Sequence, residues 1–256
     1  MVASEVAKSF RPMSHLVFGA NTDTGKTIIS AGLARSALLG SFHGSKNVDT
    51  ALVNYTKPLQ CGGSDESFVR KVVDALRKNG SILHGQFESQ TLFKWVTPAS
   101  PHYASRLEQK PISDNEIIKS VLTNLHNFEI RCIEENKQGI QFIETAGGVM
   151  SPASSSPQNK NSTHAGSSTR PRNSLDGPRE GFWGWSTQAD LYASLKLPVV
   201  LIGDGKLGGI SCTLTALEAL VCRGYKVNAI IFLRSHTDTS VASINKVASQ
   251  EFLQTR

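Results

Sequence analysis

The stretch GANTDTGKT at residues 19–27 has the residue types and spacing of a loop that binds phosphate groups. A phosphate-binding loop of the form G-x-x-x-x-G-K-[ST] fits this stretch when Ala20 takes the place of the first glycine. In that register Gly25 lets the backbone approach a phosphate, Lys26 reaches the β- and γ-phosphate oxygens, and Thr27 offers a hydroxyl to magnesium. The alternative is a Gly/Thr turn before an ordinary helix. The predicted ATP-binding residues are Ala20, Asn21, Thr22, Asp23, Thr24, Gly25, Lys26 and Thr27.

Three charged residues further along the chain stand where a nucleotide site needs them. In parallel α/β sheets ligands bind beyond the carboxyl ends of the strands, and magnesium prefers oxygen ligands. Lys57 is predicted just after the second strand, and Glu144 at the end of an apolar strand over 139–143. Asp65 opens a helix, where the alternative is that it only stabilises the helix N-terminus. We expect Thr27, Asp65 and Glu144 to hold Mg²⁺.

The elements that position these residues alternate short apolar runs with helical patterns, which is typical of a parallel sheet with crossover helices. Strands are predicted over 15–18, 50–55, 139–143, 198–202 and 227–233. Helices are predicted over 26–39, 64–78, 113–125 and 212–223. Ser113 and Glu116 form a capping box at the start of the third helix. The predicted fold is a single α/β domain with a doubly wound, mostly parallel sheet and a P-loop nucleotide-binding architecture.

The domain is predicted to span residues 15–235, between an N-terminal tail over 1–14 and a diverged or truncated tail over 236–256. Residues 154–180 interrupt the pattern because they hold almost no large apolar side chain and are rich in Ser, Asn, Pro and Arg. Such a segment cannot bury enough apolar surface to offset the entropy of ordering. We therefore predict a disordered, low-complexity insertion in a loop of the domain.

The composition argues against several classes of protein. The net charge is +6, but Lys and Arg form no basic run, so nucleic-acid binding is not expected. No apolar run approaches the roughly 20 residues of a membrane helix, so no membrane span is expected. The four cysteines stand far apart without a C-x-x-C pair. With no secretory signal, they indicate reduced thiols in a protein that is not secreted.

Together these residues resemble the dethiobiotin synthetase family, and most closely the synthetase half of the eukaryotic bifunctional proteins that also carry diaminononanoate aminotransferase. Six motifs carry the resemblance in order. Five residues separate Gly19 from Gly25, one more than the general pattern allows, and the family's phosphate loop has the same extra residue after its first glycine. The motifs are GANTDTGKT at 19–27, YTKPLQCGG at 55–63, SDE at 64–66, TPASPH at 97–102, ETAGGVMSP at 144–152 and QADLYASLKLPVVLIGDGKLGGIS at 188–211.

The resemblance implies an ATP- and Mg²⁺-dependent ring closure that makes dethiobiotin from 7,8-diaminononanoate and carbon dioxide. A carbamate forms on one amine, ATP phosphorylates it, and the second amine attacks the mixed anhydride. Lys26 and Lys57 would be catalytic, neutralising charge on the phosphoryl group and the carbamate. The implied substrate-binding residues are Thr22, Asp23, Lys57, Cys61, Gly147, Gly148, Val149 and Met150. A homodimer and a mitochondrial, otherwise cytoplasmic, location are also implied.

Three residues depart from the family pattern. Asp23 stands where many bacterial members have Glu, which shortens the reach into the diamine site by one methylene. Cys61 replaces a Ser or Thr and is a weaker hydrogen-bond donor. Leu233 lies near the position where bacterial members often place an Asn that reads adenine, so the choice of base is not predicted.

Two other functions remain open at this point. A related P-loop ATPase of the partitioning type would usually carry another Lys early in the loop, and residues 21–24 contain none. A non-enzymatic remnant would lack the C-terminal part that holds the base.

Overall fold

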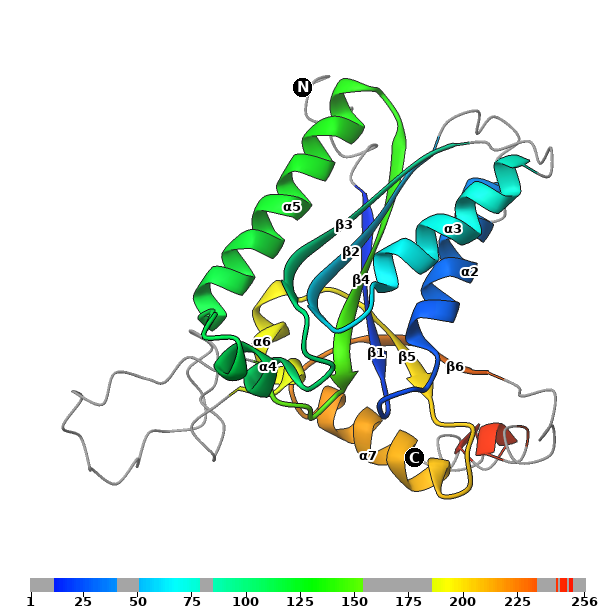
Figure 1. Ribbon diagram of the computed structural model, residues 1–256. Helices are drawn as coiled ribbons and strands as arrows, with labels where there is room; N and C mark the ends of the chain where they lie inside the picture. The colour runs from blue at the N-terminus through cyan, green and yellow to red at the C-terminus, as the bar shows by residue number, and fades with distance from the viewer. Residues whose placement is uncertain are drawn as a thin grey trace.

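The computed structural model describes residues 12–40, 51–78, 85–153 and 186–233, with residues 243, 245–247 and 249–250. In these residues one sheet of six parallel strands has the order β3-β2-β4-β1-β5-β6 (Figure 1). The strands are β1 Met13–Gly19, β2 Ala51–Cys61, β3 Gly85–Trp95, β4 Gln138–Gly148, β5 Val199–Gly203 and β6 Val227–Phe232. The predicted doubly wound α/β fold is confirmed.

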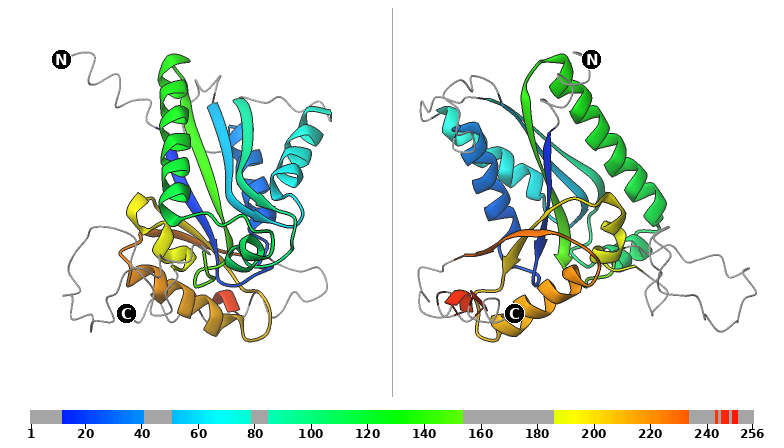
Figure 2. Two further views of the ribbon diagram at one scale, coloured as in Figure 1. Left: turned by 60° about the vertical axis from the view of Figure 1, so that its left-hand side comes forward. Right: turned by 180° about the vertical axis from the view of Figure 1, so that it is seen from behind.

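Helices cover both faces of the sheet, with α2 and α3 on one face and α5 on the other (Figure 2). The helices are α2 Lys26–Leu38, α3 Asp65–Lys78, α4 Pro101–Leu107, α5 Asp114–Glu134, α6 Gln188–Leu191, the 3₁₀ turn η1 Ala193–Leu195, and α7 Gly209–Val221. Side chains alternate between the two faces of each strand. In β1, Leu16 and Phe18 therefore join one apolar core, and Val17 between them joins the other.

The capping box at the start of α5 is confirmed, because Ser113 Oγ accepts from the Glu116 N–H and the Glu116 carboxylate accepts from the Ser113 N–H. Strand β3 was not predicted. It lies at the edge of the sheet, and most of its side chains are half-buried, so its sequence GQFESQTLFKW lacks the apolar run of a central strand.

Two strands run further than predicted. The last pair between β2 and β4 is Thr56–Ile143, and beyond it β2 pairs with β3 alone. Pro58 has no N–H to donate, and it is tolerated there because one side of the strand is unpaired. Lys57 therefore lies inside β2 and not after it, and Glu144 likewise lies inside β4.

The predicted insertion over 154–180 lies outside the described residues, as do residues 1–11 and most of 236–256. Other predicted boundaries also differ, since β1 begins at Met13, α7 spans Gly209–Val221, and α5 continues to Glu134, beyond the predicted end at 125. Near the C-terminus, the buried Asn245 donates to the carbonyl oxygens of Asp204 and Lys206 after β5. None of the described helices is long and apolar enough to cross a membrane.

Candidate active site

The predicted phosphate loop joins the end of β1 to the start of α2. Gly25 has φ 90°, in the left-handed region that favours glycine, and Lys26 is the first residue of α2. The Ala20 N–H donates to the Ile202 carbonyl of β5 at 2.8 Å, which holds the loop against the sheet. Free N–H groups at the first turn of α2 make this a site for an anion.

Gly19 is required by the loop although it precedes the matched register. A Cβ added there would lie 2.7 Å from both the Asn21 carbonyl oxygen and Thr24 Oγ1, and 3.0 Å from Lys26 Nζ. Contacts below 3.0 Å force neighbouring atoms to move, and one of these is a backbone atom. The absence of a side chain at Gly19 thus lets the backbone pass close to Lys26.

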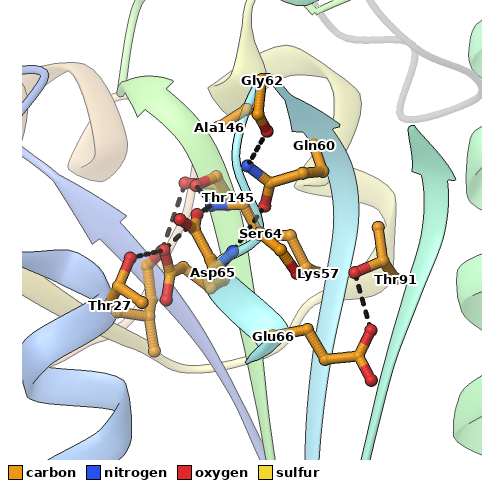
Figure 3. A network of polar contacts seen from close by, with 12 residues as sticks. Thr27, Lys57, Gln60, Gly62, Ser64, Asp65, Glu66, Thr91, Thr145 and Ala146 are labelled. Atoms are coloured by element: carbon orange, nitrogen blue, oxygen red, sulfur yellow. Dashed lines mark hydrogen bonds and ion pairs between the residues drawn. The ribbon is translucent and has the colours of Figure 1, made fainter. Parts of the chain in front are cut away.

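A charged cluster lies at the carboxyl ends of β2 and β4, beside the loop (Figure 3). Lys57 Nζ is 2.7 Å from Asp65 Oδ2 and 2.9 Å from Glu144 Oε1. Glu144 is fully buried and also accepts hydrogen bonds from Thr27 Oγ1 at 2.9 Å and from the Tyr55 hydroxyl at 3.0 Å. The three residues predicted to hold Mg²⁺ and one predicted catalytic lysine are therefore neighbours.

The two lysines of the cluster have opposite pKa shifts. Burial alone would lower the pKa of Lys57, but Glu144 and Asp65 together outweigh it and raise the pKa. Burial, reinforced by the nearby Lys57 ammonium, lowers the pKa of Lys26 to about 8. Lys57 is thus charged at neutral pH. Lys26 is also mostly charged at neutral pH, but it loses its proton at a lower pH than an ordinary lysine does.

A cavity of about 760 Å³ opens onto this cluster. The predicted residues that line it are Thr22, Asp23, Gly25, Lys26, Thr27, Lys57, Cys61, Asp65, Glu144 and Gly147. Ser100 and Pro101 of the TPASPH motif close another side of it. Nucleotide, metal and substrate residues predicted from distant motifs are thus brought to one cavity.

Five of the six other predicted residues lie around a second cavity of about 380 Å³, which shares Ser151 with the first. They are Gly148, Val149 and Met150, together with residues 20–21. The sixth, Thr24, is buried and lines neither cavity. The Gly148 N–H donates to Ser151 Oγ, and the Val149 N–H donates to the Gly19 carbonyl. These two N–H groups are used within the fold, and the substrate-binding role implied for Gly148 and Val149 stays a prediction.

The comparisons with known proteins agree with this geometry. Residues 14–161 match the family described as the AAA domain. The chain belongs to this family.

Among its relatives, the rice (Oryza sativa subsp. japonica) bifunctional dethiobiotin synthetase/7,8-diamino-pelargonic acid aminotransferase, mitochondrial, is 31% identical over 84% of this chain. The bifunctional dethiobiotin synthetase/adenosylmethionine-8-amino-7-oxononanoate aminotransferase of Emericella nidulans is 32% identical over 86%. The chain spans 27% and 22% of those two proteins. The ATP-dependent dethiobiotin synthetase of Phenylobacterium zucineum is 24% identical over 86% of this chain and 76% of its own length. The predicted resemblance is confirmed and is favoured over a partitioning-type ATPase.

Sequence reasoning missed two residues that contact the charged cluster, Tyr55 and Gln60, although both stand in the YTKPLQCGG motif. Tyr55 donates to Glu144, and burial followed by the Glu144 charge raises its pKa well above the usual value, so it stays a neutral donor. The Gln60 side chain accepts from the Asp65 N–H at 3.2 Å and so positions the start of α3. Glu66 points elsewhere and accepts from Thr91 of β3 (Figure 3).

The donor set fits Mg²⁺. Thr27, Asp65 and Glu144 offer only hydroxyl and carboxylate oxygens, which Mg²⁺ prefers. No group of three or more His, Cys, Asp or Glu side chains able to hold a metal is found in the described residues. Mg²⁺ needs only a small number of protein ligands, because it keeps several waters and also binds phosphate oxygens. The predicted ligands are therefore chemically adequate for a metal–nucleotide complex.

Proposed function

We propose that this chain catalyses the ATP-dependent ring closure of 7,8-diaminononanoate with carbon dioxide to dethiobiotin. The observation that carries the proposal is one cavity that joins a phosphate loop, two lysines and three carboxylates. The relatives named as dethiobiotin synthetases support it across most of the chain.

Each part of the cavity has a role in such a reaction. The phosphate loop binds the triphosphate, and Lys26 neutralises charge on the transferred phosphoryl group. Lys57 neutralises the carbamate oxygens, and Thr22 and Asp23 face the diamine, whose ammonium groups suit a carboxylate. Cys61 remains a neutral thiol, because burial raises its pKa to about 11. Phosphoryl transfer needs mainly this positioning and charge neutralisation.

Mg²⁺ held by Thr27, Asp65 and Glu144 would bridge the phosphates and neutralise part of their charge. We further propose a homodimer, which would cover exposed apolar side chains beside the second cavity. Met150 lines that cavity and is 47% exposed. Leu207, which precedes α7, is a further exposed apolar side chain, at 93%. A mitochondrial location is proposed from the name of the rice relative.

The deciding experiment supplies the purified chain with diaminononanoate, bicarbonate and magnesium-ATP and detects dethiobiotin by mass spectrometry. ATP turnover that does not depend on the diamine would favour a partitioning-type ATPase instead. Absence of nucleotide binding would favour a non-enzymatic remnant.

Lys26→Ala is expected to lower turnover by at least about a thousandfold, because charge stabilisation on the phosphoryl group is lost. The fold should survive, since Lys26 forms no ion pair within the described residues. Circular dichroism and thermal unfolding check the fold. Turnover that persists in a folded Lys26→Ala protein would contradict the role of the loop.

A further inference from the structure

The Lys57 ammonium uses its whole hydrogen-bonding capacity on its own protein. An ammonium has three N–H donors. Lys57 Nζ has three acceptors: Asp65 Oδ2 at 2.7 Å, Glu144 Oε1 at 2.9 Å and the Thr145 carbonyl oxygen at 3.2 Å (Figure 3). The side chain is also almost fully buried. No donor is left for a substrate, so Lys57 can act on one only after it releases an acceptor.

Two of these three acceptors are the carboxylates that we expect to hold a divalent cation. A cation bound to Asp65 and Glu144 would stand within a few ångströms of the Lys57 ammonium, in a site with little water to screen them. Repulsion between like charges is strong under these conditions. The third acceptor, the Thr145 carbonyl, lies outside the predicted ligand set and remains available to Lys57.

The other lysine of the site does not compete in this way. Lys26 is buried near the same carboxylates but forms no ion pair with either of them in the described part of the chain. Glu144 also accepts hydrogen bonds from Thr27 and Tyr55, and both of these donors are uncharged hydroxyl groups. Among the described residues, Lys57 is therefore the one cation paired with both Asp65 and Glu144, in the position of a bridging cation.

We propose that the Lys57 ammonium and a divalent cation are alternative occupants of the Asp65–Glu144 carboxylate pair, so that cation binding releases Lys57 into the substrate cavity. The inference rests on the proposed function only for the identity of the substrate. It also sets an order of events. The positive charge of Lys57 becomes available to the substrate only after the metal–nucleotide complex has bound. Lys57 would then assist the phosphoryl transfer from that nucleotide.

The first test measures Mn²⁺ binding to the full chain without nucleotide, by the loss of the free Mn²⁺ signal in electron paramagnetic resonance. Lys57→Gln is expected to bind Mn²⁺ about tenfold or more tightly than the wild type, because the competing charge is gone. Lys26→Gln is the matched control, since it removes an equal charge that does not touch the carboxylates. An unchanged affinity in Lys57→Gln, or an equal gain in both variants, would overturn the proposal.

The second test uses the wild-type chain and so does not depend on the folding of a variant. Lysines are methylated with formaldehyde and cyanoborohydride with and without Mn²⁺, and the rates are read by peptide mass spectrometry. Mn²⁺ should accelerate methylation of Lys57 several-fold and leave the exposed Lys119 of α5 unchanged. Equal or slower labelling of Lys57 with Mn²⁺ would refute the exchange. Neither test requires turnover, so failure of the proposed function would appear separately, in the dethiobiotin assay.

Discussion

Two buried polar networks lie back to back on the same two strands, β2 and β4. On the face covered by α2 and α3, the Lys57 ammonium meets the Glu144 carboxylate at 2.9 Å. On the face covered by α5, Gln141 Nε2 donates to Thr56 Oγ1 at 3.3 Å and to Asn124 Oδ1 at 2.5 Å. One network is charged and opens into the large cavity. The other is built mainly of neutral groups that bond to one another, and at its edge Asn54 donates to Glu88 beside a separate cavity of about 520 Å³.

The comparison teaches that burial of polar groups alone does not mark a functional site. Thr56 and Gln141 are as fully buried as Glu144. Neutral groups that satisfy one another cost little to bury and specify the packing of α5 on the sheet. Buried charges are costly unless they are paired, and here the pairing partners are residues that the reaction would use. The buried lysine and carboxylate of the first network, and not burial or access to a cavity, distinguish it from the second.

Among the variants that test this comparison, the largest effect should follow from Glu144→Gln, which keeps the shape of the charged network and removes the Glu144 charge. We expect the rate of dethiobiotin formation to fall by about a hundredfold or more, since a preorganised charge is lost. Asp65→Asn is the matched comparison and should cost less, because Asp65 is 30% exposed and Glu144 is fully buried. Steady-state kinetics of the two variants measure the difference. A smaller loss in Glu144→Gln than in Asp65→Asn would contradict this ranking.

In the network around Gln141, the change Gln141→Leu should lower the stability of the fold and leave the turnover of each folded molecule unchanged. The change removes the donor shared by Asn54, Thr56 and Asn124, so the free energy of unfolding should fall by about 2 kcal/mol. Chemical denaturation measures this loss. Ile143→Leu, an apolar exchange on the same face of β4, is the control and should cost less than about 1.5 kcal/mol. A loss of turnover per folded molecule in Gln141→Leu would show that the two networks are coupled.

The smallest expected effect is a pH dependence of ATP binding, and it should arise from the charged site alone. The pKa of Lys26 is about 8 without ligand, and bound phosphates favour its charged form. Below pH 8 Lys26 already carries its proton, so ATP affinity should change little there. Above pH 8 binding must take up a proton, so the dissociation constant should rise up to about tenfold per pH unit, equivalent to about 1.4 kcal/mol.

Calorimetric titration between pH 7 and 9.5 measures this dependence. Lys26→Gln should bind ATP more weakly and with little change across the range. Equal pH dependence in both proteins would assign the effect to another group.

Local patterns in the sequence determined much of the fold. The apolar runs located five of the six strands, because central parallel strands are buried on both faces and need continuous apolar side chains. The glycine, lysine and threonine of the phosphate loop and the Ser113–Glu116 capping box were predictable because their geometry depends on neighbours within a few residues. The sequence predicted only in part which site residues would share the first cavity. That prediction relied on strands that end at one edge of the sheet.

Tertiary structure alone decided the rest. β3 became a strand because it pairs with β2, and its own residues carry little signal. Lys57 lies inside β2 because β4 stops pairing before Pro58. The three acceptors of the Lys57 ammonium come from α3 and β4, the latter more than 80 residues away along the chain. A motif shows which groups are present, but their contacts, and so their charges and free donors, depend on segments that only folding brings together.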